Sequence, residues 1–336
     1  MKRQQAFILA FGLLVCAGLP SYAQNVTDDK GRKQGEWIKK DDKGRIVYKG
    51  QFKNDIPVDT FTYYNRKGAV DMKNIYSDGG KKTHTLLMYP NGRIKAEGDY
   101  FNKKKEGVWT YYTEKGIMIS QENYKNNLKD GTEKKWDTQG KDLIEQTEYV
   151  KGVKNGAYFK TLYEDGYIKA NYKDGELDGD YKEFYPDDVL RTQGQFKNGK
   201  REGKWNVYDM SSVLVRKLTY VNDSLTSDLL LLNVQQGVKE TEQSDIAVIR
   251  QAGKQSQIIL TSGDRINVFN SLGSIIPLTD NNVFYRINEK SELYININTV
   301  QGVNADGSVK TTFDCGEKIM PDKDGLKLLN SLFSRD

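Results

Sequence analysis

The residues of this chain that could do chemistry are few and lie far apart in the sequence. His84 is the only histidine, and the 336 residues include two cysteines, Cys16 and Cys315. A zinc site needs several Cys or His ligands at short spacing, and nucleophilic catalysis needs a nucleophile beside a base. Neither pattern occurs here. We therefore interpret His84 as a degenerate structural position and Cys315 as a packed or half-exposed thiol in a turn.

Two acidic segments offer oxygen ligands. The stretch from Asp174 to Asp188 reads DGELDGDYKEFYPDD, which could hold calcium or supply paired carboxyls for glycoside hydrolysis. Hydrolysis needs two carboxyls that face each other across about 5 to 10 Å, whereas these acids fall mostly in the turns of one predicted hairpin. We interpret them as solvated turns. The segment from Asp322 to Gly325 begins like a calcium loop but lacks the later ligands, so it predicts a helix N-terminus.

These observations predict a protein that is not an enzyme, with no catalytic residue, metal or cofactor. Aromatic side chains are the better candidates for binding, because rings on a sheet surface stack on sugars or on peptide side chains. The alternative is that the rings pack on one another as a core. Neighbouring aromatic residues put a ring on each face of a strand. On that basis the candidate binding residues are Tyr63, Tyr64, Trp109, Tyr111 and Tyr112.

The elements that would position these rings belong to a motif of about 24 residues that recurs eight times. An aromatic closes each copy: Phe52, Tyr76, Tyr100, Tyr124, Tyr149, Tyr172, Phe196 and Tyr220. A small or turn-favouring residue opens it: Gly35, Asp59, Thr83, Gly107, Gly131, Gly156, Gly179 and Gly203. An internal turn gives a third register: Gly44, Gly68, Gly92, Gly116, Gly140, Gly166, Asp188 and Ser212. Three registers that share one period indicate a repeat array.

Each copy is predicted to be a β-hairpin. In the first, Glu36 to Lys40 and Ile46 to Lys53 are the strands, with turns at residues 41–45 and 54–58. The period of two places the aromatic residues on one face and Lys, Glu, Asp and Thr on the other. Eight hairpins in series predict a single-layer antiparallel sheet of sixteen strands, whose two ends need covering.

Three glycines interrupt the aromatic face of the predicted sheet. They either leave room for a large ring on the neighbouring strand or mark β-bulges. These glycines are Gly50, Gly98 and Gly194.

The chain after the repeats has a different composition. The block to Tyr220 carries a net positive charge and most of the aromatic residues, whereas the rest is net negative and richer in Ile, Leu, Val and Asn. We predict a lead-in at residues 24–34, the array at 35–222 and a β-rich domain at 223–336 that covers the end of the array. It ends in a helix from Asp324 to Phe333. Its predicted strands are Leu229 to Val234, Ile246 to Arg250, Gln257 to Thr261, Arg265 to Phe269, Val283 to Ile287, Leu293 to Val300 and Val309 to Phe313.

The N-terminus has the features of a secretory signal peptide. Lys2 and Arg3 precede an apolar run, and Ser21 to Ala23 supplies small residues for cleavage, so we expect residues 1–23 to be removed. Lipidation at Cys16 is the alternative, and Val15 before it argues against that. We expect an exported protein of the periplasm or cell envelope, possibly secreted, with no transmembrane segment in the mature chain. The diluted positive charge does not favour nucleic acid.

Two segments resemble a known repeat. GQFKNGKREGKW, from Gly194 to Trp205, is similar to the membrane occupation and recognition nexus (MORN) repeat. EGVWTYYTEKG, from Glu106 to Gly116, is similar to the variant form found in bacterial proteins. The resemblance implies the hairpin fold, and it implies a role among scaffolds, membrane-association modules, protein-binding modules or antitoxin-like proteins. Trp or Tyr stands where the ordinary repeat has its second glycine, so lipid binding is not expected here.

The functional hypothesis is an exported repeat scaffold that binds a protein partner in the bacterial envelope. Glycan or peptidoglycan binding through the aromatic face is one alternative. An antitoxin-like or immunity role is another. The sequence leaves the oligomeric state open.

Overall fold

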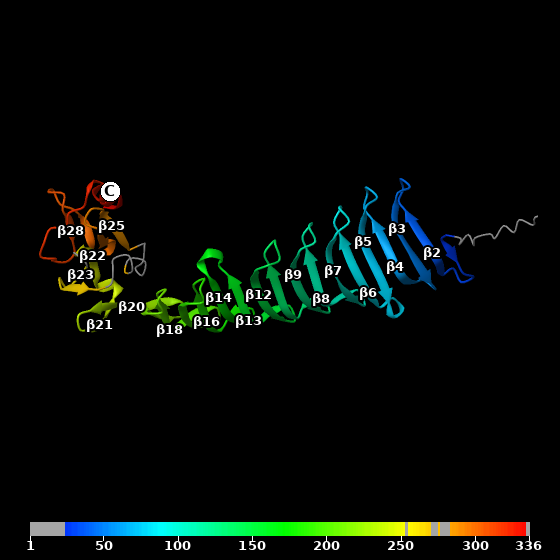
Figure 1. The fold of residues 1–336 in the computed structure, drawn as a ribbon, viewed down its shortest axis with the longest axis horizontal. Coiled ribbons are helices and arrows are strands. Elements are labelled where there is room, and N and C mark those ends of the chain that lie inside the picture. The colour runs from blue at the N-terminus through cyan, green and yellow to red at the C-terminus, as the bar shows by residue number, and fades with distance from the viewer. Residues whose placement is uncertain (1–23, 253–254, 270–274, 276–282, 334–336) are drawn as a thin grey trace, which may run out of the picture. The chain divides into compact units, whose positions relative to one another are not determined.

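The computed structural model describes residues 24–252, 255–269, 275 and 283–333. The predicted signal peptide, with Cys16, lies outside the described residues. Strands β1 to β21 form one antiparallel sheet built from hairpins, which Figure 1 shows as a succession of adjacent antiparallel arrows. A five-stranded sheet, a two-stranded sheet and helix α2 (Lys323–Phe333) follow. The predicted fold class, a hairpin array followed by a β-rich region with a short terminal helix, is confirmed.

The strands of the large sheet follow the chain. They are β1 (Val26–Thr27), β2 (Lys33–Lys40), β3 (Ile46–Lys53), β4 (Ile56–Tyr64), β5 (Val70–Ser77), β6 (Lys82–Met88), β7 (Ile94–Phe101), β8 (Lys104–Tyr112), β9 (Met118–Lys125), β10 (Leu128–Lys129), β11 (Gly131–Trp136), β12 (Leu143–Val150), β13 (Val153–Thr161), β14 (Tyr167–Lys173), β15 (Glu176–Leu177), β16 (Gly179–Phe184), β17 (Leu190–Lys197), β18 (Lys200–Tyr208), β19 (Leu214–Val221), β20 (Ser224–Val234) and β21 (Gly237–Glu242). Short 3-10 turns lie at Asp78–Gly80, Tyr163–Asp165 and Gln243–Asp245.

The chain divides into two compact units within the repeats. The first holds the residues up to Lys129 together with Thr138–Gly140, and the second holds Asp130–Asp137 and the residues from Lys141 onward. The large sheet runs on past residue 222 through β20 and β21. The region predicted as a separate domain from 223 therefore begins with a hairpin of the array's own sheet.

Two-residue turns connect one copy to the next. Asn54 and Asp55 have φ of 52° and 67°, and Asn126 and Asn127 have φ of 52° and 72°. Positive φ at both central residues is the signature of the type I′ turn, whose twist matches that of the strands and which favours Asn, Asp and Gly. The prediction of a longer turn at residues 54–58 is wrong, because β4 already begins at Ile56.

The turn within each copy needs positive φ at its last position. Six of the eight residues in this register are glycines, and the remaining two, Asp188 and Ser212, both have φ of 62°. The first residue of the turn supplies hydrogen bonds as well. In the first copy, Asp41 Oδ1 accepts from the N–H groups of Lys43 and Arg45 at 3.0 and 2.9 Å. Such side-chain contacts close the turn locally.

Both predicted roles of the three face glycines are confirmed. The strand register shifts at Gly50, Gly98 and Gly194, which marks a bulge at each. A Cβ at any of these positions would overlap a ring on the next strand. The rings are those of Phe61, Trp109 and Trp205, respectively.

The five-stranded sheet has the order β24-β23-β22-β26-β25. Its strands are β22 (Ile246–Ala252), β23 (Gln255–Leu260), β24 (Arg265–Val268), β25 (Phe284–Asn288) and β26 (Leu293–Asn296). The predicted strand from Leu293 to Val300 is interrupted by a 3-10 turn at Ile297–Thr299. Asn296 caps this turn by accepting from the N–H of Asn298. The chain then forms the pair β27 (Val300–Val303) and β28 (Val309–Thr311).

The five-stranded sheet is buried on both faces. One cluster of buried side chains joins Ile259, Ile287 and Ile295 to Leu329 of α2. The other joins Ile249 and Ile258 to Leu230 and Leu232 of β20. Leu230 and Leu232 are 0% and 2% exposed. Apolar burial between β20 and this sheet therefore covers the last long strand of the array.

Candidate binding surfaces

The aromatic rings of the array pack mainly on one another. In the first unit, the ring of Phe61 lies edge-on to Tyr76 at 5.2 Å, and that of Trp109 lies edge-on to Tyr100 at 5.1 Å between centroids. In the second unit, Trp205 contacts Phe196 at 5.3 Å in the same geometry. Edge-to-face pairs at these distances are favourable. These rings form the core of the array.

The five candidate binding residues fall into different environments. Trp109 is 1% exposed, so its ring belongs to the core rather than to an open surface. The other four, Tyr63, Tyr64, Tyr111 and Tyr112, are half-buried. Tyr111 lies beside Trp109 on the aromatic face, whereas the Tyr112 hydroxyl donates to Glu97 on the opposite face at 2.5 Å. The structure thus brings Trp109 and Tyr111 together and leaves Tyr63 and Tyr64 in an earlier copy.

Tyr63 and Tyr112 both have hydroxyls of low acidity. Burial, together with a hydrogen bond to Tyr76, raises the pKa of Tyr63. Burial and the hydrogen bond to Glu97 raise the pKa of Tyr112 to about 12. Both side chains therefore stay neutral at physiological pH.

A polar cluster surrounds Glu122 on the aromatic face of the fourth copy. The Tyr124 hydroxyl donates to Glu122 Oε2 at 2.7 Å, and Lys129 Nζ lies 3.0 Å from Oε1. Burial alone would raise the pKa of Glu122, but hydrogen bonds from Tyr124, Tyr111 and Lys129 outweigh it and lower the pKa to about 2. Glu122 is therefore ionised throughout the physiological range. We call Lys105, Trp109, Tyr111, Glu122, Tyr124 and Lys129 the Glu122 cluster.

Lys105 completes the Glu122 cluster. Its ammonium lies 4.2 Å from the Trp109 ring centroid and 4.5 Å from that of Tyr124, and it donates to the Tyr111 hydroxyl at 3.1 Å. Burial lowers the pKa of Lys105. The cation–π contacts hold the ammonium against the rings.

The sequence prediction named Trp109 and Tyr111 but missed the charged members of this cluster. A signal for Lys105 was present, because a cation stands four residues before the central ring in several copies. Lys33 lies 4.8 Å from the Trp37 ring, and Lys154 lies 5.6 Å from that of Tyr158. Glu122 has no such signal, since the same register holds Gly50, Gly98 and Gly194 in other copies.

The opposite face of the first unit carries His84. Its Nδ1 lies 2.7 Å from Asp99 Oδ1 and its Nε2 lies 3.8 Å from Glu97 Oε2, while Lys82 Nζ lies 3.1 Å from Asp99 Oδ2. Burial raises the pKa of Asp99, but the contacts with His84 and Lys82 outweigh it and leave that pKa below its ordinary value. His84 thus belongs to a surface ion-pair network.

An apolar row accompanies this network on the same face. Strand pairing places Ile75 opposite His84, and Phe101 lies two residues beyond Asp99 on β7, so all four share a face. The members of the row are each 41% to 50% exposed. We call Ile56, Ile75, Phe101, Val108 and Leu128 the apolar row.

The remaining sequence candidates occupy structural positions. Asp174 and Asp188 lie in two turns of the same hairpin, both with positive φ. Cys315 is 7% exposed, and its thiol donates to the carbonyl of Glu317 at 2.7 Å. Asp322 accepts from the N–H of Gly325 at the start of α2, as a helix N-terminus requires.

Neither metal clusters nor membrane spans are found where the structure describes the chain. In those ranges no three His, Cys, Asp or Glu side chains come together in a way that could hold a metal ion. None of the helices within the same ranges combines the length and apolar character that crossing a membrane requires.

Comparisons with known proteins bear on the repeats. The family described as MORN repeat variant matches residues 105–126 and 177–198, which include parts of the fourth and seventh copies. No curated protein matches the chain. Among solved structures, the Photorhabdus luminescens Tc holotoxin pore matches with a TM-score of 0.16 and 10% identity, over 77% of this chain and 14% of that chain. That similarity is too low to carry an argument about fold or function. The two family matches, taken with eight hairpins that share three registers, show that this chain is a MORN-type repeat protein.

Proposed function

We propose that the protein is an exported, non-enzymatic repeat scaffold of the bacterial envelope that binds a protein partner. The observation that carries the proposal is the apolar row. Soluble proteins scatter single apolar side chains over their surface, whereas a concentration of them on one face is characteristic of an interaction surface. Here five such side chains share the face that the aromatic core leaves open.

The surroundings of the row favour a protein over a glycan. His84, Asp99 and Lys82 lie among the apolar side chains, and a polar rim around apolar contacts is typical of protein interfaces. Sugar binding by stacking needs open rings. The central rings Phe61 and Trp109 are 3% and 1% exposed, so the aromatic face offers less for that purpose.

The proposal of export rests on the sequence of residues 1–23. A partner in the envelope follows from that export. The repeat family supports the scaffold role, since such arrays present an extended surface along a series of stacked units.

The experiment is a cross-linking capture from envelope extract, with the chain from Gln24 as bait. The test variant carries Phe101→Lys and Val108→Lys, and the matched control carries Val153→Lys, another exposed valine at 45% in the second unit. We expect a stoichiometric protein partner that the double variant loses and the control keeps. Retention by both variants would rule out the apolar row as the interface. Enrichment of cell-wall fragments without protein would instead support the glycan alternative.

A further inference from the structure

The last long strand of the array is only partly covered by its neighbour. β20 runs from Ser224 to Val234, but β21 pairs with it only from Leu229 to Val234. The chain leaves the sheet at the 3-10 turn that begins at Gln243. The first five residues of β20 therefore have β19 on one side and no strand on the other among the described residues.

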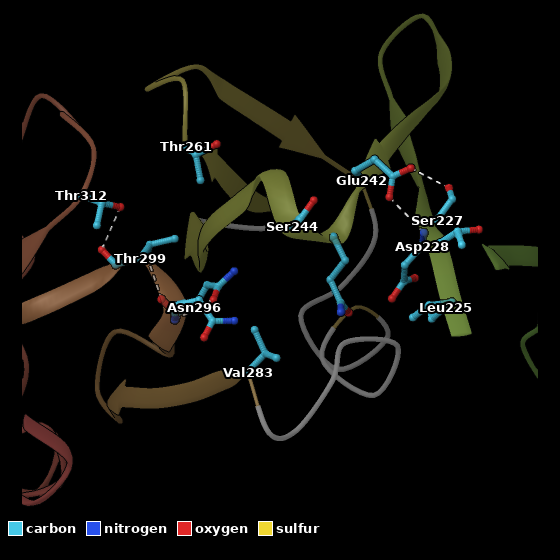
Figure 2. Close-up of a pocket in the computed structure, with 13 residues that line it drawn as sticks. Leu225, Ser227, Asp228, Glu242, Ser244, Thr261, Val283, Asn296, Thr299 and Thr312 are labelled. Carbon is cyan, nitrogen blue, oxygen red and sulfur yellow. Dashed lines mark hydrogen bonds between the residues drawn. The ribbon is translucent and has the colours of Figure 1, made fainter. Parts of the chain in front are cut away.

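A groove of about 480 Å³ occupies the position that β21 leaves open. Leu225 to Asp228 form one wall, and Thr261, Asn298, Thr299 and Thr312 contribute to the rest. Figure 2 shows Leu225, Ser227 and Asp228 on β20, with Thr299 and Thr312 on separate segments of the chain across the groove. The volume lies in the range of ligand sites.

The backbone of β20 is directed toward this groove. The N–H of Asp228 donates to Glu242 Oε2 at 2.9 Å, and the Ser227 hydroxyl donates to Oε1 of the same carboxylate at 2.6 Å (Figure 2). A side-chain carboxylate thus satisfies a strand-edge amide that a neighbouring strand would satisfy in a continuous sheet. This contact shows which side of β20 has the hydrogen-bonding potential of an open edge.

The acidic residues of the groove already have partners. Asp228 forms a bidentate pair with Arg216, with Nε to Oδ1 at 2.6 Å and Nη2 to Oδ2 at 2.5 Å. Glu242 is engaged by Ser227 and by the backbone of Asp228. The groups left to contact a ligand are mainly hydroxyls and amides, with Leu225 as an apolar contact at 48% exposure.

This lining selects among ligand classes. Hydroxyl and amide groups donate and accept hydrogen bonds in the same way as a peptide backbone. No aromatic ring is found among the described residues that line the groove, so a sugar would lack a stacking surface. A strongly charged ligand would lack an unpaired counter-charge.

We propose that the groove binds an extended peptide segment of a protein partner, which pairs with Leu225 to Asp228 as an added strand in line with β21. This assignment rests on the proposed protein-binding function and gives it a second site. Five strand residues span about 17 Å, so the site fits a segment of about five residues. Main-chain hydrogen bonds would supply affinity, and the contact with Leu225 would supply side-chain preference.

The test uses a phage-displayed library of random linear peptides, selected against the purified chain and measured by fluorescence polarisation. Ser244 is exposed and lines the groove, so Ser244→Trp fills it without disturbing a buried contact. Ser211→Trp is the matched control in an exposed turn outside the lining. We expect the filled variant to weaken binding of the selected peptides by at least about tenfold and the control to leave it unchanged. Amide hydrogen exchange at Leu225 to Asp228 should slow when peptide is bound.

Three outcomes would overturn the assignment. They are the failure of any peptide to be enriched, equal binding by wild type and Ser244→Trp, or unprotected amides at Leu225 to Asp228 in the complex. These results are separable from a failure of the proposed function. That failure would appear as the absence of any protein partner in the envelope capture, whatever the peptides do.

Discussion

The indole of Trp109 on β8 occupies the space above Gly98 on β7, where a Cβ atom would overlap the ring. The register of the two strands shifts at Gly98, so a bulge and a missing side chain together admit the largest ring of the copy. Trp109 is 1% exposed as a result. The same relationship joins Gly50 to Phe61 and Gly194 to Trp205, which makes it the packing rule of this array.

Gly98→Ala is expected to destabilise the first unit by about 1 to 3 kcal/mol, because the added methyl forces the ring or the strand to move. Trp109→Ala alone should cost about 3 to 5 kcal/mol through loss of the buried ring. The double variant removes the clash, so its cost should be clearly less than the sum of the two. Denaturant unfolding of all three variants measures this coupling. Simple additivity would show that the two residues do not compete for the same space.

Ser212→Gly is expected to stabilise the protein by about 0.5 to 1 kcal/mol. Ser212 has φ of 62°, a left-handed conformation that costs a residue with a Cβ more than it costs glycine. Ser211→Gly in the same turn is the control. Ser211 lies outside the set of positive-φ residues, so glycine there should give no gain. Thermal unfolding checks both, and a lower melting temperature for Ser212→Gly would contradict the conformational argument.

Acid should weaken the Glu122 cluster. The folded pKa of Glu122 is about 2, below its ordinary value of 4.5, so the unfolded chain takes up the proton first as pH falls. The stabilisation from ionised Glu122 is therefore complete above about pH 4.5 and is lost progressively as pH falls toward 2.

Glu122→Gln tests this linkage. The variant should be less stable at neutral pH, and its unfolding free energy should change less between pH 5 and pH 2.5 than that of the wild type. Glu114→Gln, an exposed turn glutamate, serves as the control. An identical pH profile for wild type and Glu122→Gln would contradict the assigned role.

The Arg216–Asp228 pair should be sensitive to loss of one partner. Its side chains are 18% and 10% exposed, and two hydrogen bonds join them. Asp228→Ala leaves the guanidinium without its counter-charge and should cost about 3 to 5 kcal/mol. The double change Arg216→Met with Asp228→Leu should cost less than Asp228→Ala. Chemical denaturation separates the two cases. A larger loss in the double variant would mean that the pair contributes mainly through its ionic bond.

Much of the array could be predicted because its determinants are local. Gly44 and its equivalents mark a backbone position that needs positive φ, and Asp188 and Ser212 satisfy the same requirement. The aromatic registers follow from the period of two in a strand. The helix at the C-terminus was predicted from Leu326, Leu329 and Phe333, and α2 spans Lys323–Phe333.

The candidate sites were predicted less well, because they depend on which strand neighbours which. Trp109 was chosen as a binding ring, yet its burial depends on Gly98 and Tyr100 in the preceding strand. Glu122 occupies a register that elsewhere holds glycine, so only the nearby hydroxyls of Tyr111 and Tyr124 and the ammonium of Lys129 explain a carboxylate there.

The sequence by itself determined the hairpin repeat, its turns and the alternation of its two faces, since each depends on residues close together in the chain. The tertiary structure alone decided which rings are buried and that β20 covers the C-terminal sheet with Leu230 and Leu232. It also decided that β21 stops short of the start of β20. Those features arise from contacts between residues distant in sequence, whose burial and pairing no local pattern encodes.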